Sequence, residues 1–189
     1  MAPDIASLRT TLLERPDLIP PEAIRPGAAP LRLAIGDLVM AGPGGIEMLA
    51  FNPAGDIALV RCRTVQEGSA GSAVVLGQVL EDAAAIGGSA YWELDARVRE
   101  RTGTGLADAM QERMALAGAE AAWDRTAFEQ RAGEALESGD LTLVIALDRT
   151  DERLLRTIHF IWEAWAVVLP LRVVALARSE GEWHAEIVY

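Results

Sequence analysis

Residues 45–82 read GIEMLAFNPAGDIALVRCRTVQEGSAGSAVVLGQVLED, and this stretch decides the fold. Two apolar runs, Gly45 to Phe51 and Asp56 to Arg63, flank the turn sequence NPAG, which predicts a pair of antiparallel strands. After the flexible sequence EGSAGS, apolar side chains recur at helical spacing until Gly87. The stretch therefore predicts two paired strands followed by a helix from about residue 73 to residue 86.

A third strand is predicted before this pair, because Leu31 to Met40 is another apolar run and the turn sequence AGPG follows it. The three strands would form an antiparallel meander. Alternate residues of a strand share a face. In the last strand of the meander, residues 56–63, this places Ile57, Leu59, Arg61 and Arg63 on one face and Ala58, Val60 and Cys62 on the other.

The chain before the meander predicts a short helix over residues 4–14, which Pro16 ends and which should lie on the sheet. Five prolines between Pro16 and Pro30 indicate an extended, stiff connection to the first strand.

After the meander, the pattern predicts three helices between Tyr91 and Gly139, the third opened by a capping box from Thr126 to Glu129. Leu141 to Leu147 is a continuous apolar run, typical of a central strand covered on both faces. A helix over residues 151–167 and strands over 171–177 and 183–188 complete the chain. This order predicts one α/β domain over residues 1–189, with a mixed sheet and helices on both faces.

The composition favours a packed domain in a reducing cytoplasm. Half of the residues are apolar (51%), and neither a secretion signal nor an apolar run long enough to span a bilayer is present. The net charge of −11 disfavours binding to nucleic acid through its phosphates. Cys62 is the single cysteine, so no intrachain disulfide or Cys/His zinc cluster can form.

Several residues that can carry chemistry are better interpreted as structural. Cys62 lies in an apolar run, which favours a buried core thiol over a reactive one. His159 and His184 have no nucleophile or third partner nearby in the sequence. The same packing interpretation applies to Met110, Met114, Trp123 and Phe128.

The order helix, three-strand antiparallel meander, helix, strand resembles the core of the PD-(D/E)xK, or restriction-endonuclease-like, nucleases. A bacterial group of that superfamily carries phrases of the type G-x-IDLLAxDxxGxLVVIELKR and VVxQxLDYAxxLxGLSYEEL. The corresponding text here is GIEMLAFNPAGDIALVRCRT and VVLGQVLEDAAAIGGSAYWEL, with LLERPDLIP upstream and ALESGDLTLVIALD downstream. The resemblance implies a nuclease-like core at 1–90, a helical insertion at 91–139 and a strand, helix and hairpin at 140–189 that complete the sheet.

In this family the Asp of IDLL and the Glu of ELK bind one or two Mg²⁺ ions, and the Lys orients the attacking water. By position, these residues become Glu47, Arg61 and Arg63, while the helix glutamine is kept as Gln78 and the aromatic of DYA becomes Asp82. A guanidinium cannot take the place of an oxygen ligand. The resemblance therefore implies a degenerate site, and we predict that Glu47 and Arg61 pair directly, the guanidinium replacing the metal. A solvated basic strand face is the alternative for Arg61 and Arg63.

Three functions remain open at this level. The favoured one is a catalytically inactive nuclease-like protein, without a cofactor, that acts as an interaction or scaffolding module for an unidentified protein partner. The second is a Mg²⁺-dependent DNA endonuclease that uses Glu47 and Asp82, with Asp56 or Glu67 as lesser helpers. The third is a non-cleaving DNA-binding module in which Arg61 and Arg63 contact phosphates. The tryptophan-rich C-terminal third also offers a surface for a homodimer.

Overall fold

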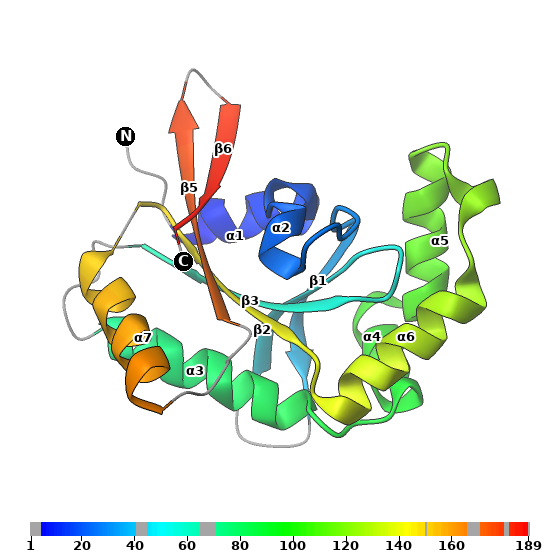
Figure 1. Cartoon of the computed structure of the whole chain (residues 1–189). Coiled ribbons are helices and arrows are strands. Elements are labelled where there is room, and N and C mark those ends of the chain that lie inside the picture. The colour runs from blue at the N-terminus through cyan, green and yellow to red at the C-terminus, as the bar shows by residue number, and fades with distance from the viewer. Residues whose placement is uncertain are drawn as a thin grey trace.

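A six-stranded mixed sheet, with strands in the order β1-β2-β3-β4-β5-β6, forms the centre of the molecule in the computed structural model (Figure 1). The structure describes residues 5–40, 45–64, 71–149, 151–165, 171–179 and 182–188. The strands are β1 (Leu33–Val39), β2 (Gly45–Phe51), β3 (Ile57–Arg63), β4 (Thr142–Leu147), β5 (Leu171–Ser179) and β6 (Glu182–Ile187). The predicted α/β class is confirmed.

The first three strands form the expected antiparallel meander. β4 then pairs in parallel with β3, β5 pairs in parallel with β4, and β6 returns antiparallel to β5. All six residues of β4 are buried, which confirms a central strand covered on both faces.

Helices cover both faces of the sheet, and Figure 1 shows α1 and α2 on one side of it and α3 and α7 on the other. On the first side lie α1 (Ile5–Glu14), η1 (Pro16–Leu18) and α2 (Pro21–Ile24). On the second lie α3 (Gly71–Ile86), α4 (Tyr91–Thr102), α5 (Leu106–Leu116), η3 (Glu120–Ala122), α6 (Arg125–Ser138) and α7 (Glu152–Trp165). No helix within the described ranges is long and apolar enough to cross a membrane.

The alternation of β3 divides the interior into two cores. Ile57 and Leu59 face the larger core, under α3 to α7. Ala58, Val60 and Cys62 face the smaller core, under α1 and α2. The predicted alternation is therefore confirmed, and it places Arg61 at the end of the face that packs against α3.

The proline-rich connection was predicted to be extended, but it contains two short helices. Pro16 begins η1 and Pro21 begins α2. Proline is tolerated in the first turn of a helix, where its missing N–H has no intrahelical partner. Ile19 and Ala23 of this segment are buried, so apolar packing onto the sheet orders it.

The start of α6 also differs from the prediction. Its N-cap is Asp124, whose Oδ1 accepts the Ala127 N–H at 3.0 Å. The predicted capping box at Thr126 and Glu129 is wrong, because Thr126 already lies inside the first turn. Aspartate and threonine are both good N-caps, and the carboxylate two residues upstream takes the position.

Gly55 lets the β2–β3 turn approach α6 closely. Its φ is +93°, a left-handed conformation that favours glycine. A Cβ at this position would lie 2.7 Å from the Phe128 carbonyl oxygen and 2.9 Å from the Arg131 Cβ. The turn is therefore held against the backbone of α6 at a distance that only glycine permits.

We expect Gly55→Ala to lower the free energy of unfolding by about 3 kcal/mol, because it adds a steric clash to a strained backbone. Gly118→Ala is the matched control, since Gly118 also has a positive φ (+68°) but open space around it. It should cost only about 1 kcal/mol. Urea denaturation of both variants measures the difference, and equal losses would contradict the close approach.

Candidate functional site

Arg61 is the centre of a polar cluster at the end of β3. Its Nε donates to Asp82 Oδ2 at 2.6 Å and its Nη2 donates to Asp82 Oδ1 at 2.7 Å, so the aspartate on α3 binds the guanidinium through both oxygens. Nη1 lies 3.5 Å from Glu47 Oε2. The predicted pair of Glu47 and Arg61 is present, but the closer partner is Asp82.

A kink in β1 and β2 brings Glu47 to this position. The β1–β2 register pairs Gly36 with Met48 and Leu38 with Ile46 but skips the position of Asp37 and Glu47 between them. Asp37 has a φ of +57°. Side chains change face across this pair: Ile35 and Leu38 both enter the larger core, although strict alternation would separate them. The β2–β3 ladder ends at the pair of Leu49 and Leu59, so the strands no longer pair regularly beside Glu47.

The Glu47 carboxylate completes the backbone hydrogen bonding at this interrupted ladder. Its Oε1 accepts the Cys62 N–H at 3.1 Å. Burial raises the pKa of Glu47 above its ordinary value, although the Cys62 N–H and Arg61 both favour the ionised form. Burial likewise raises the pKa of the Cys62 thiol well above its ordinary value. Cys62 is thus a buried core residue, as predicted.

The cluster is largely enclosed. The side chains of Arg61, Glu47 and Asp82 are 18%, 16% and 9% exposed. Burial alone would lower the pKa of Arg61, but the contacts with Asp82 and Glu47 outweigh it and the pKa is raised. A small hollow of about 240 Å³ opens beside the cluster, and it is lined by Asp37, Val39, Gly45, Ile46, Glu47 and Arg61.

This arrangement does not fit a bound Mg²⁺. The metal needs several oxygen ligands at about 2.0–2.1 Å, and both carboxylates of the cluster already hold the guanidinium of Arg61. A divalent ion between Glu47 and Asp82 would lie against a permanent positive charge. The side chains therefore form an ion cluster of one base and two acids, in which the guanidinium pairs with both carboxylates.

The other positions implied by the resemblance lie near this cluster. Gln78 is half-buried on α3, one turn before Asp82. Within the described part of the chain, the guanidinium of Arg61 contacts Glu47, Asp82 and the Gly45 carbonyl oxygen, and not Gln78. Arg63 is half-buried and shares the face of Arg61. A solvated basic face does not describe Arg61, and Glu67 lies outside the described residues.

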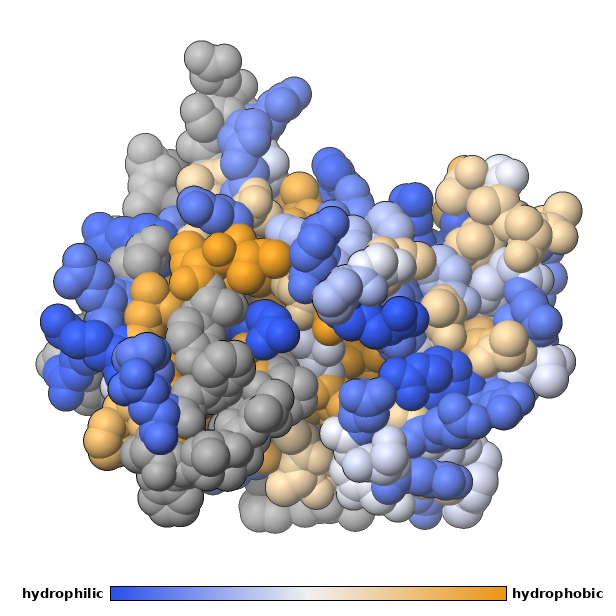
Figure 2. Space-filling model, viewed as in Figure 1, coloured by the Kyte–Doolittle hydropathy of each residue, from blue (hydrophilic) through white to orange (hydrophobic). Residues whose placement is uncertain are grey.

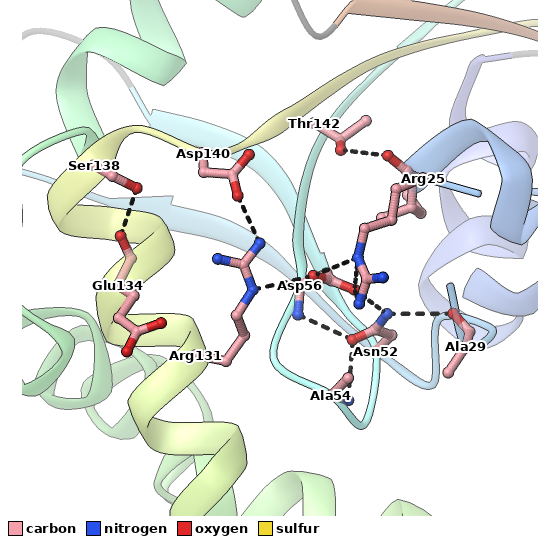
Figure 3. Close-up of polar contacts among 11 residues, drawn as sticks. Arg25, Ala29, Asn52, Ala54, Asp56, Arg131, Glu134, Ser138, Asp140 and Thr142 are labelled. Atoms are coloured by element: carbon pink, nitrogen blue, oxygen red, sulfur yellow. Dashed lines mark hydrogen bonds and ion pairs between the residues drawn. The ribbon is translucent and has the colours of Figure 1, made fainter. Parts of the chain in front are cut away.

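Asp56 belongs to a second cluster, at the opposite end of β3. It lies five residues before Arg61, about 16 Å along an extended strand, so it cannot assist a metal beside Glu47. That part of the alternative is wrong. Figure 3 shows Arg25 and Arg131 reaching Asp56 from opposite sides. Arg25 Nε donates to both Asp56 carboxylate oxygens at 3.1 Å, and Arg25 Nη2 lies 2.9 Å from Asp56 Oδ2. Arg131 Nε donates to Asp56 Oδ1 at 3.3 Å.

Asn52 and Asp140 complete this second cluster (Figure 3). Asn52 Nδ2 donates to Asp56 Oδ2 at 2.7 Å, and Arg131 Nη2 donates to Asp140 Oδ2 at 2.6 Å. Burial acts to raise the pKa of Asp56, but Arg25 and the other donors outweigh it and the pKa is lowered. The cluster joins α2, the β2–β3 turn and α6, which gives it a structural role.

The remaining residues with chemical potential have ordinary packing or surface roles. Met110, Met114 and Phe128 are buried in the larger core, as predicted. Trp123 packs on Phe128 and donates from Nε1 to the Pro53 carbonyl oxygen at 2.9 Å. His159 is exposed on α7 beside Glu163, at 3.1 Å.

No family model, curated protein or solved structure matches this chain. The interpretation of the two clusters therefore rests on their geometry.

We expect Arg61→Leu to lower the free energy of unfolding by about 2–3 kcal/mol, because it leaves two enclosed carboxylates without their cation. A double-mutant cycle with Asp82→Leu should give a coupling energy of about 2 kcal/mol, measured by urea denaturation. The control is the exposed pair of Arg97 and Glu100, for which the same cycle should give about 0.5 kcal/mol or less. Equal couplings would contradict a special role for Arg61.

Asp56→Asn should lower the free energy of unfolding by about 2 kcal/mol at neutral pH, because it removes the negative charge that binds Arg25 and Arg131. The pKa of Asp56 is lowered in the fold, so its contribution is present above the ordinary value of 3.8 and is lost as pH falls through the folded value. Below pH 3.8 the stabilities of the variant and the natural protein should converge. Denaturation at a series of pH values checks this, with Glu137→Gln, an exposed residue of α6 outside the cluster, as control. Parallel curves for Asp56→Asn and the natural protein would contradict the prediction.

Proposed function

We propose that the chain is a non-catalytic relative of the PD-(D/E)xK nucleases that acts as a protein-interaction or scaffolding module. One observation carries the proposal: the guanidinium of Arg61 is bound by Asp82 at 2.6 Å and 2.7 Å and lies 3.5 Å from Glu47. In the family that the sequence resembles, this part of the fold holds a metal ion. Here a side-chain cation of the chain itself compensates the carboxylates.

The order of elements supports the same ancestry. A first helix, α1, precedes the antiparallel meander β1 to β3, and α3 and then β4 follow. The positions that the resemblance assigns to the metal site, Glu47 and Arg61, lie on neighbouring strands of this meander, and α3 brings Asp82 to them.

One observation favours the second candidate, the Mg²⁺-dependent nuclease: Glu47 and Asp82 converge on a single cation, as two metal ligands would. Mg²⁺ would have to displace Arg61 from both carboxylates, so this function ranks second. A DNA-binding role for Arg61 ranks below it. A phosphate approaching that guanidinium would meet two carboxylates, on a chain of net charge −11.

Metal titration tests the proposal. In the natural protein, 10 mM Mg²⁺ or Mn²⁺ should leave the melting temperature unchanged, show no heat of binding in calorimetry and leave plasmid DNA intact. The double variant Arg61→Glu/Arg63→Lys restores the residue types that the family carries. We expect it to gain stability with Mg²⁺, by about 1.4 kcal/mol at a concentration ten times Kd.

The outcomes of these assays are distinct. Mg²⁺-dependent cleavage by the natural protein that disappears in Asp82→Ala would establish the nuclease instead. Salt-sensitive retention of DNA without cleavage would favour the DNA-binding module. A double variant whose stability does not respond to Mg²⁺ would contradict descent from a metal site at these positions.

A further inference from the structure

β1 is an edge strand whose outer side carries no strand partner within the described chain. An edge strand presents a row of backbone N–H and C=O groups that can pair with another extended segment. Such edges are common docking sites for peptides, which add a strand to the sheet.

A trough runs along this edge. A hollow of about 410 Å³ is lined by four consecutive residues, Leu33 to Gly36, and a second of about 270 Å³ is lined by Leu31 and Arg32. Consecutive residues point to opposite faces of a strand, so both hollows follow its edge. They share Arg113 and Leu116 and so lie next to each other, and we name the two hollows together the β1 trough. Six extended residues span about 20 Å.

The opposite wall of the β1 trough is one face of α5. The residues on it recur three or four apart: Ala109, Glu112, Arg113, Leu116 and Ala117. The neighbouring face of the same helix holds Leu106, Met110 and Met114 in the larger core, which fixes the wall in place.

The wall carries one large exposed apolar side chain beside its charged residues Glu112 and Arg113. Leu116 is 81% exposed, although water contact is unfavourable for a leucine side chain. Figure 2 shows the lobe at the upper right, where Figure 1 places α5, mostly in the pale orange of mildly hydrophobic residues.

The shape of the β1 trough favours a single extended peptide segment as its occupant. Neighbouring strands lie about 4.8 Å apart, and α5 stands opposite the edge of β1. The folded edge of a second copy would bring its own helical layers against α5, whereas an isolated segment meets no such obstacle. The β1 trough also continues along the strand in both directions from Arg113, which suits an internal segment of a partner better than a chain terminus.

The exposed Arg113 favours an acidic residue at the centre of that segment. The larger hollow carries Arg101 and Arg113 against Glu112, and Arg101 already lies 3.6 Å from Asp37, so Arg113 is the base there that is available to a ligand. The smaller hollow is lined by Arg32 and Arg113 against Glu14 and Asp17, and Asp17 is held by Arg15 at 3.0 Å. Arg113 is the charged residue common to both hollows and is exposed, so it lies where a partner's carboxylate would gain a charge-assisted hydrogen bond.

We propose that the β1 trough binds an extended internal segment of a protein partner as a seventh strand, with an apolar side chain against Leu116 and a carboxylate side chain on Arg113. This inference rests on the proposed function, because it names where that interaction module takes its partner. It involves none of the residues of the Arg61 cluster.

Labelled synthetic peptides test the proposal by fluorescence anisotropy. The probe is a nine-residue peptide of alternating threonine and valine with a central glutamate and blocked ends. We expect this peptide to bind the natural protein. Arg113→Glu and Leu116→Asp should each raise the Kd for the peptide roughly tenfold or more. The matched controls are Arg153→Glu and Phe160→Asp, two exposed residues of α7 that receive the same changes; they should bind as the natural protein does.

Three further probes define the mode of binding. A peptide with alternate N-methylated amides should not bind, because it cannot pair with a strand edge, and a central lysine should weaken binding. A free C-terminal carboxylate should give no advantage over blocked ends. Analytical ultracentrifugation of the natural protein and of Leu116→Asp should show the same oligomeric state. A dimer of the natural protein that Leu116→Asp dissociates would identify a second copy as the occupant and overturn the proposal.

Failure of this docking site is distinguishable from failure of the proposed function. If the glutamate peptide does not bind, or binds Arg113→Glu equally well, the β1 trough is not the docking site. The metal titration of the natural protein is unaffected by that result, because the Arg61 cluster and the trough share no residue.

Discussion

The end of β3 depends on one interaction, the binding of the Arg61 guanidinium by Asp82 and Glu47. Two enclosed carboxylates without a cation would repel one another and lose their hydration. The arginine offsets both costs and adds two short hydrogen bonds to Asp82. It also joins the meander to α3, so the first half of the sheet and the helix that covers it are held at the point where the β2–β3 ladder stops.

The kink at Asp37 and Glu47 and the ion cluster depend on each other. Where the β2–β3 ladder stops, the Glu47 carboxylate accepts the Cys62 N–H, a donor that a continued ladder would direct to β2. Without Arg61, the carboxylate would be buried beside a second acid. The other end of β3 uses the same principle, where Asp56 receives Arg25 and Arg131. Buried carboxylates are thus compensated by arginine at both ends of this strand.

The sequence patterns predicted the features of the fold that depend on residues close together in the chain or on adjacent strands. The limits of β2, the alternation of β3 and the pair of Glu47 with Arg61 all follow from strand periodicity and adjacent strands. The stronger partner of Arg61 was missed, because the side of α3 that meets β3 is set by tertiary packing. The Asp56 cluster was missed for a similar reason: Arg25 and Arg131 are 31 and 75 residues away in the chain.

A tethered cation changes what the fold can evolve toward. A site compensated by a metal is stable only while the ion is supplied, because ligand binding contributes RT ln(1 + [L]/Kd) to folding. An arginine on β3 has no such concentration dependence, so this scaffold keeps its charge balance without a ligand. Under the proposed function, selection on the former metal site is then relaxed, and new contacts can arise elsewhere on the sheet. The open edge of β1 is suited to this, because pairing there uses backbone groups that any sequence supplies, and only the wall formed by α5 has to be specific.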